Sequence, residues 1–185
     1  MTNESRPGQR VSVPTRVLLG SFSADRLDPL HDLLRAARTG DESALCAVLD
    51  RARNAAVAPW PGVDGAVVVA VPAHLPGPAN PLVVAVADAV ADVDRWEHRR
   101  DALRRIRPGP EGKSADARDA RDAWAEATTL VWAPAPGGTA IVLVDDVVRT
   151  GTTLAACLLA IRAAGDLRPV LAAVLAERRR EPAGG

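Results

Sequence analysis

Apolar runs alternate with amphipathic stretches along this chain, and the alternation predicts strands that are separated by helices. Short, uninterrupted apolar runs with many β-branched residues are typical of strands buried on both faces of a parallel sheet. Such runs lie at Ala66–Val71, Ile141–Val144 and Pro169–Ala176. Shorter strands are expected at Leu103–Arg107 and Thr128–Trp132. The stretch Arg16–Phe22 fits either an edge strand or the lead-in to a helix.

Helical spacing of apolar residues predicts the elements between these strands. Near the N-terminus, Leu27–Ala37 and Leu45–Val57 have the spacing of two helices. Ser23-Ala24-Asp25 offers a cap for the first helix, and Thr39-Gly40-Asp41 ends that helix and caps the second. Three more helices are expected further along, at Pro81–Ala91, Ser114–Trp124 and Thr153–Arg162.

Strands that alternate with helices predict one α/β domain, with three layers in which helices cover both faces of a central, mostly parallel sheet. We expect a flexible arm at 1–15 and an N-terminal helical segment at 16–60 that packs on the core. The core itself is expected at 61–177, followed by a flexible tail at 178–185.

Composition narrows the class of protein. The chain has 23 basic and 23 acidic residues, and this balance argues against a nucleic-acid partner. Glycine, proline or charge interrupts every apolar run, so no membrane partner is expected. Met1–Gln9 is polar and lacks the apolar core of a signal peptide, which predicts a cytoplasmic protein. Cys46 and Cys157 lie in apolar helical patterns and are expected to be reduced.

The candidate chemistry follows the central predicted strand. Asp145 and Asp146 come directly after Ile141–Val144, and the hydroxyl-rich turn Thr150–Thr153 leads into a helix. A helix N-terminus favours an anion such as phosphate, and Gly151 lets the backbone approach it closely. The two carboxylates suit neighbouring hydroxyls, or waters around a hard cation such as Mg²⁺. Together these preferences describe a ribose 5-phosphate.

The order of an apolar run, two acids, two apolar residues and Thr-Gly-x-Thr from Ile141 to Thr153 resembles the phosphoribosyl pyrophosphate (PRPP) signature of type I phosphoribosyltransferases. Arg149 departs from it, because the family often has a small residue or threonine there. The resemblance implies a phosphoribosyltransferase-type fold, catalytic Asp145 and Asp146, and Mg²⁺ held by both carboxylates through water. It also implies that the 5-phosphate is bound by Arg149, Thr150, Gly151, Thr152 and Thr153.

The stretch after the first core strand resembles the ComF-like branch of this family. Val71-Pro72-Ala73-His74 occupies the place of the family's pyrophosphate loop, and Asn80 stands shortly before the next helix. The pyrophosphate ligands implied by this match are Pro72, Ala73, His74, Arg105 and Lys113. Two alternatives stay open: His74 is a solvated loop residue or a ligand contact, and Lys113, the one lysine of the chain, stands in its loop by function or by chance.

A second motif points to a different class. Gly112-Lys113-Ser114 ends like the phosphate-binding loop of an NTPase. That motif needs a glycine where Arg107 stands, and Pro108 and Pro110 remove N–H groups that a phosphate cradle uses. The sequence therefore argues against an NTPase.

The expected function is a phosphoribosyltransferase that uses PRPP and Mg²⁺ to transfer a 5-phosphoribosyl group to a nitrogen nucleophile, a base or an amine, with release of pyrophosphate. The alternative is a non-catalytic relative, either a regulator that binds PRPP or nucleotides or a ComF-like DNA-uptake protein. The identity of the acceptor stays open, and so does the question whether the protein forms a homodimer.

Overall fold

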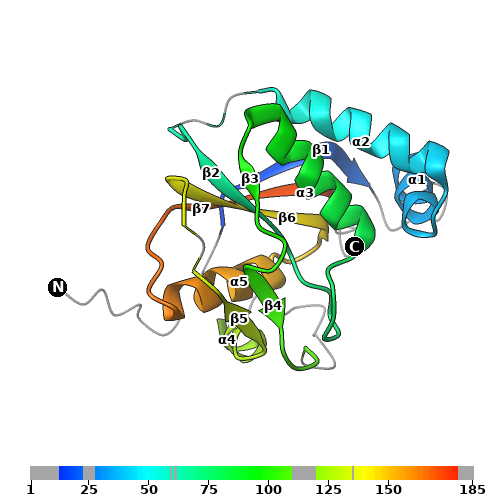
Figure 1. Ribbon diagram of the computed structural model, residues 1–185. Helices are drawn as coiled ribbons and strands as arrows, with labels where there is room; N and C mark the ends of the chain where they lie inside the picture. The colour runs from blue at the N-terminus through cyan, green and yellow to red at the C-terminus, as the bar shows by residue number, and fades with distance from the viewer. Residues whose placement is uncertain are drawn as a thin grey trace, which may run out of the picture.

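The computed structural model describes residues 13–22, 28–58, 60, 62–109, 120–134 and 136–178. It contains a five-stranded parallel sheet with the order β1-β7-β6-β2-β3, and a separate antiparallel pair, β4-β5 (Figure 1). The strands of the main sheet are β1 (Thr15–Phe22), β7 (Val170–Arg178), β6 (Ala140–Val148), β2 (Ala66–Ala70) and β3 (Glu97–His98). The expected α/β class and parallel sheet are therefore confirmed.

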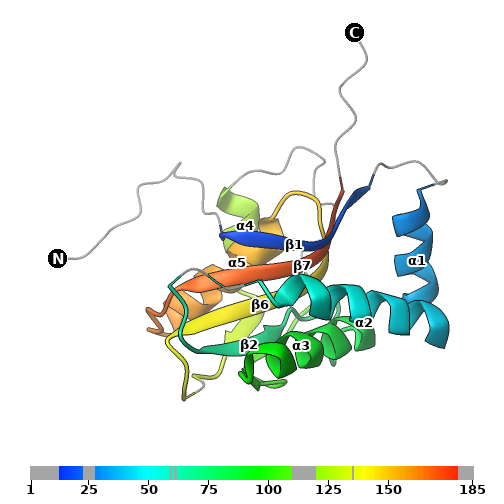
Figure 2. The ribbon, with the colours of Figure 1, turned by 90° about the horizontal axis from the view of Figure 1, so that it is seen from above.

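Helices cover both faces of the sheet. One face carries α1 (Pro29–Arg38), α2 (Glu42–Ala56) and α3 (Pro81–Asp94). The other face carries α4 (Ala120–Ala127) and α5 (Thr152–Ala163), together with the pair β4 (Leu103–Arg105) and β5 (Leu130–Trp132). Figure 2 shows α2 and α3 lying along the sheet, whereas α1 stands beyond the end of the strands.

Alternating strand residues build two separate apolar cores. Val68 and Val142 face α2 and α3, whereas Val67, Ile141 and Leu143 face α5 and the β4-β5 pair. All five of these side chains are at most 1% exposed. The uninterrupted apolar runs in the sequence are explained by this arrangement, because both faces of each central strand are buried.

The chain reverses its direction across the sheet between β2 and β6. From β2 the chain passes through α3 to β3, towards one edge, and from β6 it passes through α5 to β7, towards the other. Open parallel sheets bind ligands in the crevice outside the carboxyl ends of the strands at such a switch point. The topology therefore directs attention to the loops that follow β2 and β6.

Two helix boundaries differ from the sequence prediction. The first helix begins at Pro29, and its cap is Asp28, whose carboxylate accepts from the N–H of Leu30 at 2.9 Å. The predicted cap, Ser23-Ala24-Asp25, lies outside the described residues. Val57 is 66% exposed, because α2 ends one residue earlier.

The first and last strands of the chain also extend further than predicted. Thr15 is already part of β1, and Arg178 is the last residue of β7. The remaining predicted arm at 1–12 and tail at 179–185 lie outside the described residues.

The central strand is longer than predicted and carries the acid pair within it. β6 continues through Asp145 and Asp146 to Val148, because its pairing with β7 extends from Ile141 to Val148. Pairing with a neighbouring strand outweighs the low intrinsic strand preference of aspartate. The short strand β3 was not predicted, since its two polar residues carry no apolar pattern.

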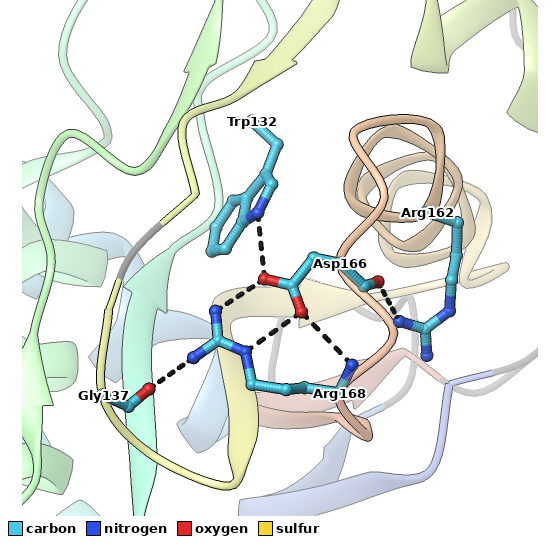
Figure 3. A network of polar contacts seen from close by, with 5 residues as sticks. All are labelled: Trp132, Gly137, Arg162, Asp166 and Arg168. Carbon is cyan, nitrogen blue, oxygen red and sulfur yellow. Dashed lines mark hydrogen bonds and ion pairs between the residues drawn. The ribbon is translucent and has the colours of Figure 1, made fainter.

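A cluster of polar contacts lies at the amino end of β7, opposite the carboxyl ends of β2 and β6 (Figure 3). Asp166 accepts from Arg168 Nη2 at 2.6 Å and from Trp132 Nε1 at 3.2 Å. Its backbone carbonyl accepts from Arg162 Nη1 at 2.6 Å, and Arg168 also donates to the carbonyl of Gly137. We call these five residues the clasp; it ties α5, β5 and the turn before β6 to the start of β7.

The clasp predicts a pH-dependent loss of stability. The hydrogen bond from Arg168 lowers the pKa of Asp166 below its usual value of 3.8. The stability that Asp166 contributes is therefore full above pH 3.8 and is lost as the pH falls through the folded-state pKa. Asp166→Ala should lower the free energy of unfolding at pH 7 by about 2 kcal/mol, as measured by urea denaturation.

Asp50→Ala is the matched control, because Asp50 forms an exposed ion pair with Arg53 and should change stability by less than about 0.5 kcal/mol. An Asp166→Ala protein as stable as this control at pH 7 would contradict the role given to the clasp.

Candidate functional site

A cleft of about 310 Å³ lies at the switch point between β2 and β6. Residues from six parts of the chain line it, and they include several that the sequence predicted to act together. They are Val71, Pro72, Ala73, His74, Asn80, Val83, Arg105, Glu126, Asp145, Asp146, Val147 and Thr153. The structure thus brings the acid pair, the predicted pyrophosphate loop and the start of α5 to one cavity.

The acid pair is held by its own backbone. Asp145 Oδ1 accepts from the N–H of Asp146 at 2.8 Å, and Asp146 Oδ1 accepts from the N–H of Val147 at 2.6 Å. Asp146 Oδ2 also forms an ion pair with Nη2 of Arg38 at 2.7 Å. The carboxylates are therefore oriented before any ligand arrives.

The surroundings of the acid pair disfavour a negative charge on both carboxylates at once. Burial raises the pKa of Asp145 to about 7, and the neighbouring charge of Asp146 adds to the increase. The hydrogen bond from the N–H of Asp146 and the charge of Arg38 act in the opposite direction. A cation or a set of hydroxyl donors at this position would relieve the strain of two adjacent carboxylates.

The turn after β6 begins α5. Gly151 is the N-cap and has φ +77°, a left-handed conformation that glycine adopts without strain. The hydroxyl groups of Thr150 and Thr152 are 2.9 Å apart, so they brace the turn from within. Thr153 lines the cleft, whereas Arg149 is exposed and is not among the lining residues. The predicted phosphate contacts of the other turn residues stay predictions.

The buried side chain of Arg105 holds the predicted pyrophosphate loop through a hydrogen bond to its backbone. Its Nε donates to the carbonyl of Ala73 at 2.7 Å, its Nη1 to Thr129 Oγ1 at 2.5 Å, and its Nη2 to Glu126 Oε1 at 2.8 Å. The side chains of Arg105 and Glu126 are each 1% exposed. Because the guanidinium already has three protein acceptors, its geometry favours holding the loop over binding pyrophosphate directly.

The ring of His74 lies against the backbone that follows β4. The N–H of Gly109 donates to the carbonyl of His74 at 3.0 Å. A Cβ at position 109 would come within 2.7 Å of the imidazole, so a larger residue there would require the ring to move. His74 is exposed at the rim of the cleft, which suits either of its two predicted roles. Lys113 falls in 110–119, outside the described residues.

Sequence reasoning missed two residues of this site. Glu126 lies beyond the predicted exposed helix, which was expected to end at Trp124, and only the fold reveals that it faces Arg105. Arg38 is one of several basic residues of the N-terminal helical segment, and nothing in its local pattern indicates a partner more than 100 residues later. Both contacts join segments that are distant in the chain.

The donor chemistry fits Mg²⁺ only with help from a ligand. No group of three or more His, Cys, Asp or Glu that could hold a metal occurs within the described residues. Mg²⁺ commonly uses one or two carboxylates and completes its shell with waters and substrate phosphates. Asp145 and Asp146 supply this kind of incomplete shell.

Comparisons with known proteins leave the family open. No protein-family model matches this chain, and no curated protein matches it significantly. Among the described helices, none has the length and apolar character needed to cross a lipid bilayer.

Loss of the buried ion pair is predicted to be costly. Arg105→Ala would leave Glu126 charged and buried without its guanidinium, so we expect the free energy of unfolding to fall by about 3 kcal/mol or more. Arg104→Ala is the matched control, because Arg104 is the exposed neighbour on β4. Urea denaturation of both variants measures the difference, and equal stabilities would contradict the described network.

Replacement of Asp145 is predicted to stabilise the ligand-free protein. The folded state holds the Asp145 proton more tightly than the unfolded state. The contribution of this group to stability is therefore full below pH 3.8 and is lost as the pH rises towards about 7. Asp145→Asn does not titrate and should be more stable than the wild type above pH 7, on the order of 2 kcal/mol.

Thermal melts of Asp145→Asn and wild type between pH 4 and 8, with a chelator present, measure this effect. Their difference should be small near pH 4 and should grow up to about pH 7. The same series with Asp101→Asn, an exposed turn residue, is the control; a wild-type protein that matches Asp145→Asn at every pH would refute the prediction.

Proposed function

We propose that this chain is a type I phosphoribosyltransferase of the ComF-like branch. It binds PRPP with Mg²⁺ and transfers the 5-phosphoribosyl group to a nitrogen nucleophile. The observation that carries the proposal is the convergence of Asp145 and Asp146, Thr153 at the start of α5, and the loop Val71–His74 on one cleft. A diol-binding pair, a phosphate-binding helix start and a second loop are the parts that a pentose with phosphates at both ends requires.

Charge in the cleft supports a metal-dependent ligand. One arginine and three carboxylates are among the lining residues, and the arginine is paired with Glu126. A bare polyphosphate would be repelled by this excess of negative charge. Mg²⁺ would be held by Asp145 and Asp146 through water, and it would neutralise charge on the diphosphate.

The residues of the chain have distinct parts in the transfer. The bond between C1 and the pyrophosphate oxygen breaks, and its electron pair leaves with pyrophosphate. The nitrogen nucleophile forms the new bond to C1 and gives its proton to solvent. Asp145 and Asp146 hold the ribose hydroxyls and favour the positive charge that develops on the ring. The turn Thr150–Thr153 anchors the 5-phosphate, so that binding energy from this remote group positions C1.

The second candidate is a non-catalytic binder of PRPP or nucleotides. Its support is Arg105, whose guanidinium is engaged with Glu126 and Ala73 and is therefore committed to the loop. Pyrophosphate would then be neutralised by other groups, including the proposed Lys113, and a protein that lacks them would bind without turnover. A ComF-like role in DNA uptake belongs to this candidate.

A pyrophosphate-release assay with PRPP, Mg²⁺ and a panel of bases and amines tests the proposal. The double variant Asp145→Asn/Asp146→Asn should lose turnover by about a hundredfold or more, because preorganised charge stabilisation at the ring is removed. Asp101→Asn should retain full activity. Binding of PRPP by the wild type without any release would favour the non-catalytic candidate, and undiminished turnover in the double variant would contradict the proposed role of the acids.

A further inference from the structure

The last residue of α1 contacts the candidate site from outside the core. Arg38 Nη2 lies 2.7 Å from Asp146 Oδ2, and the two side chains are 36% and 22% exposed. The helix is fixed in this position by its buried residues Leu34 and Ala37 and by the ring contact between His31 and Phe22 at the end of β1. The contact is thus built by the fold of the N-terminal segment.

Arg38 occupies the oxygen that a diol would use. Asp146 Oδ1 already accepts from the N–H of Val147, and Oδ2 forms the ion pair with Arg38. A carboxylate oxygen can accept more than one hydrogen bond, but a ribose hydroxyl that reaches Asp146 has to share Oδ1 with the backbone N–H or Oδ2 with the guanidinium. The backbone donor belongs to the paired strand β6 and cannot leave, whereas the arginine side chain can rotate away from the carboxylate.

Displacement of Arg38 has different consequences for different ligands. A metal-free sugar phosphate offers neutral hydroxyls in place of a guanidinium, and it leaves two adjacent carboxylates without a nearby cation. A ligand that carries a divalent cation restores a positive charge beside the two carboxylates. The ion pair with Arg38 also includes an attraction between opposite charges that a neutral hydroxyl does not supply.

We infer that Arg38 is a specificity-determining residue that makes the acid pair select sugar phosphates carrying a divalent cation over the same sugar phosphates without one. The inference rests on the proposed function, since it takes the acid pair as the ribose site. It assigns a role to the N-terminal helical segment, which delivers the competing cation.

Calorimetric titrations of the full chain with ribose 5-phosphate and with PRPP, each in Mg²⁺ and in a chelator, test this role. The variants are Arg38→Ala and Arg38→Gln, the latter retaining a polar side chain without the charge. Arg35→Ala is the matched control, because Arg35 lies on the same helix, is 70% exposed and pairs with Asp32. Thermal melts verify that each variant is folded.

In the chelator, both Arg38 variants should bind ribose 5-phosphate about fivefold more tightly than the wild type, on the scale of a partly exposed ion pair. The advantage that Mg²⁺ gives should shrink correspondingly. Long-range electrostatic attraction alone predicts the opposite change in affinity, because removal of a cation weakens the binding of a dianion. Arg35→Ala measures this long-range contribution by itself.

The outcomes separate this inference from the proposed function. If the wild type binds PRPP with Mg²⁺ but the Arg38 variants bind metal-free ribose 5-phosphate no more tightly than the wild type, the inference is overturned and the proposed function stands. If no protein binds PRPP or ribose 5-phosphate with or without Mg²⁺, both are overturned.

Discussion

Parallel pairing between β2 and β6 is the constraint on which the rest of the molecule depends. These two strands meet in register from Ala66–Ala140 to Ala70–Val144, and the chain leaves them towards opposite edges of the sheet. Their loops therefore separate at the carboxyl ends and leave a crevice between them. The cleft is a consequence of strand order, and it receives the acid pair from the carboxyl-terminal part of β6 and the loop that follows β2.

Buried polar side chains beneath the cleft hold the loop that follows β2 in place. The loop that follows β2 has several exposed residues, but the carbonyl of Ala73 is fixed by the guanidinium of Arg105. That guanidinium is fixed in turn by Glu126 of α4 and by Thr129 in the turn before β5. Removal of one partner of such a buried ion pair leaves the other charge uncompensated, so the pair keeps Arg105 in this position. The second, two-stranded sheet thus acts as a support for the main one.

Much of the fold followed from local patterns. The long apolar run at Ile141–Val144 and the glycine of the turn predicted a buried strand, a turn and a helix, because each depends on neighbours in the chain. The contacts of Arg38 and Glu126 were not predictable, since they arise from packing between distant segments. β3 escaped notice because Glu97 and His98 pair through their backbone alone, and the true cap of α1, Asp28, stands beyond a more conspicuous serine.

The clasp lies at the amino end of β7, whereas the cleft lies at the carboxyl ends of β2 and β6. Leu167, between Asp166 and Arg168, is 79% exposed. A dye or surface tether attached through this position would lie on the face of the molecule remote from the cleft. Such an attachment would allow the protein to be immobilised, or its unfolding to be followed by fluorescence, while the cleft stays accessible.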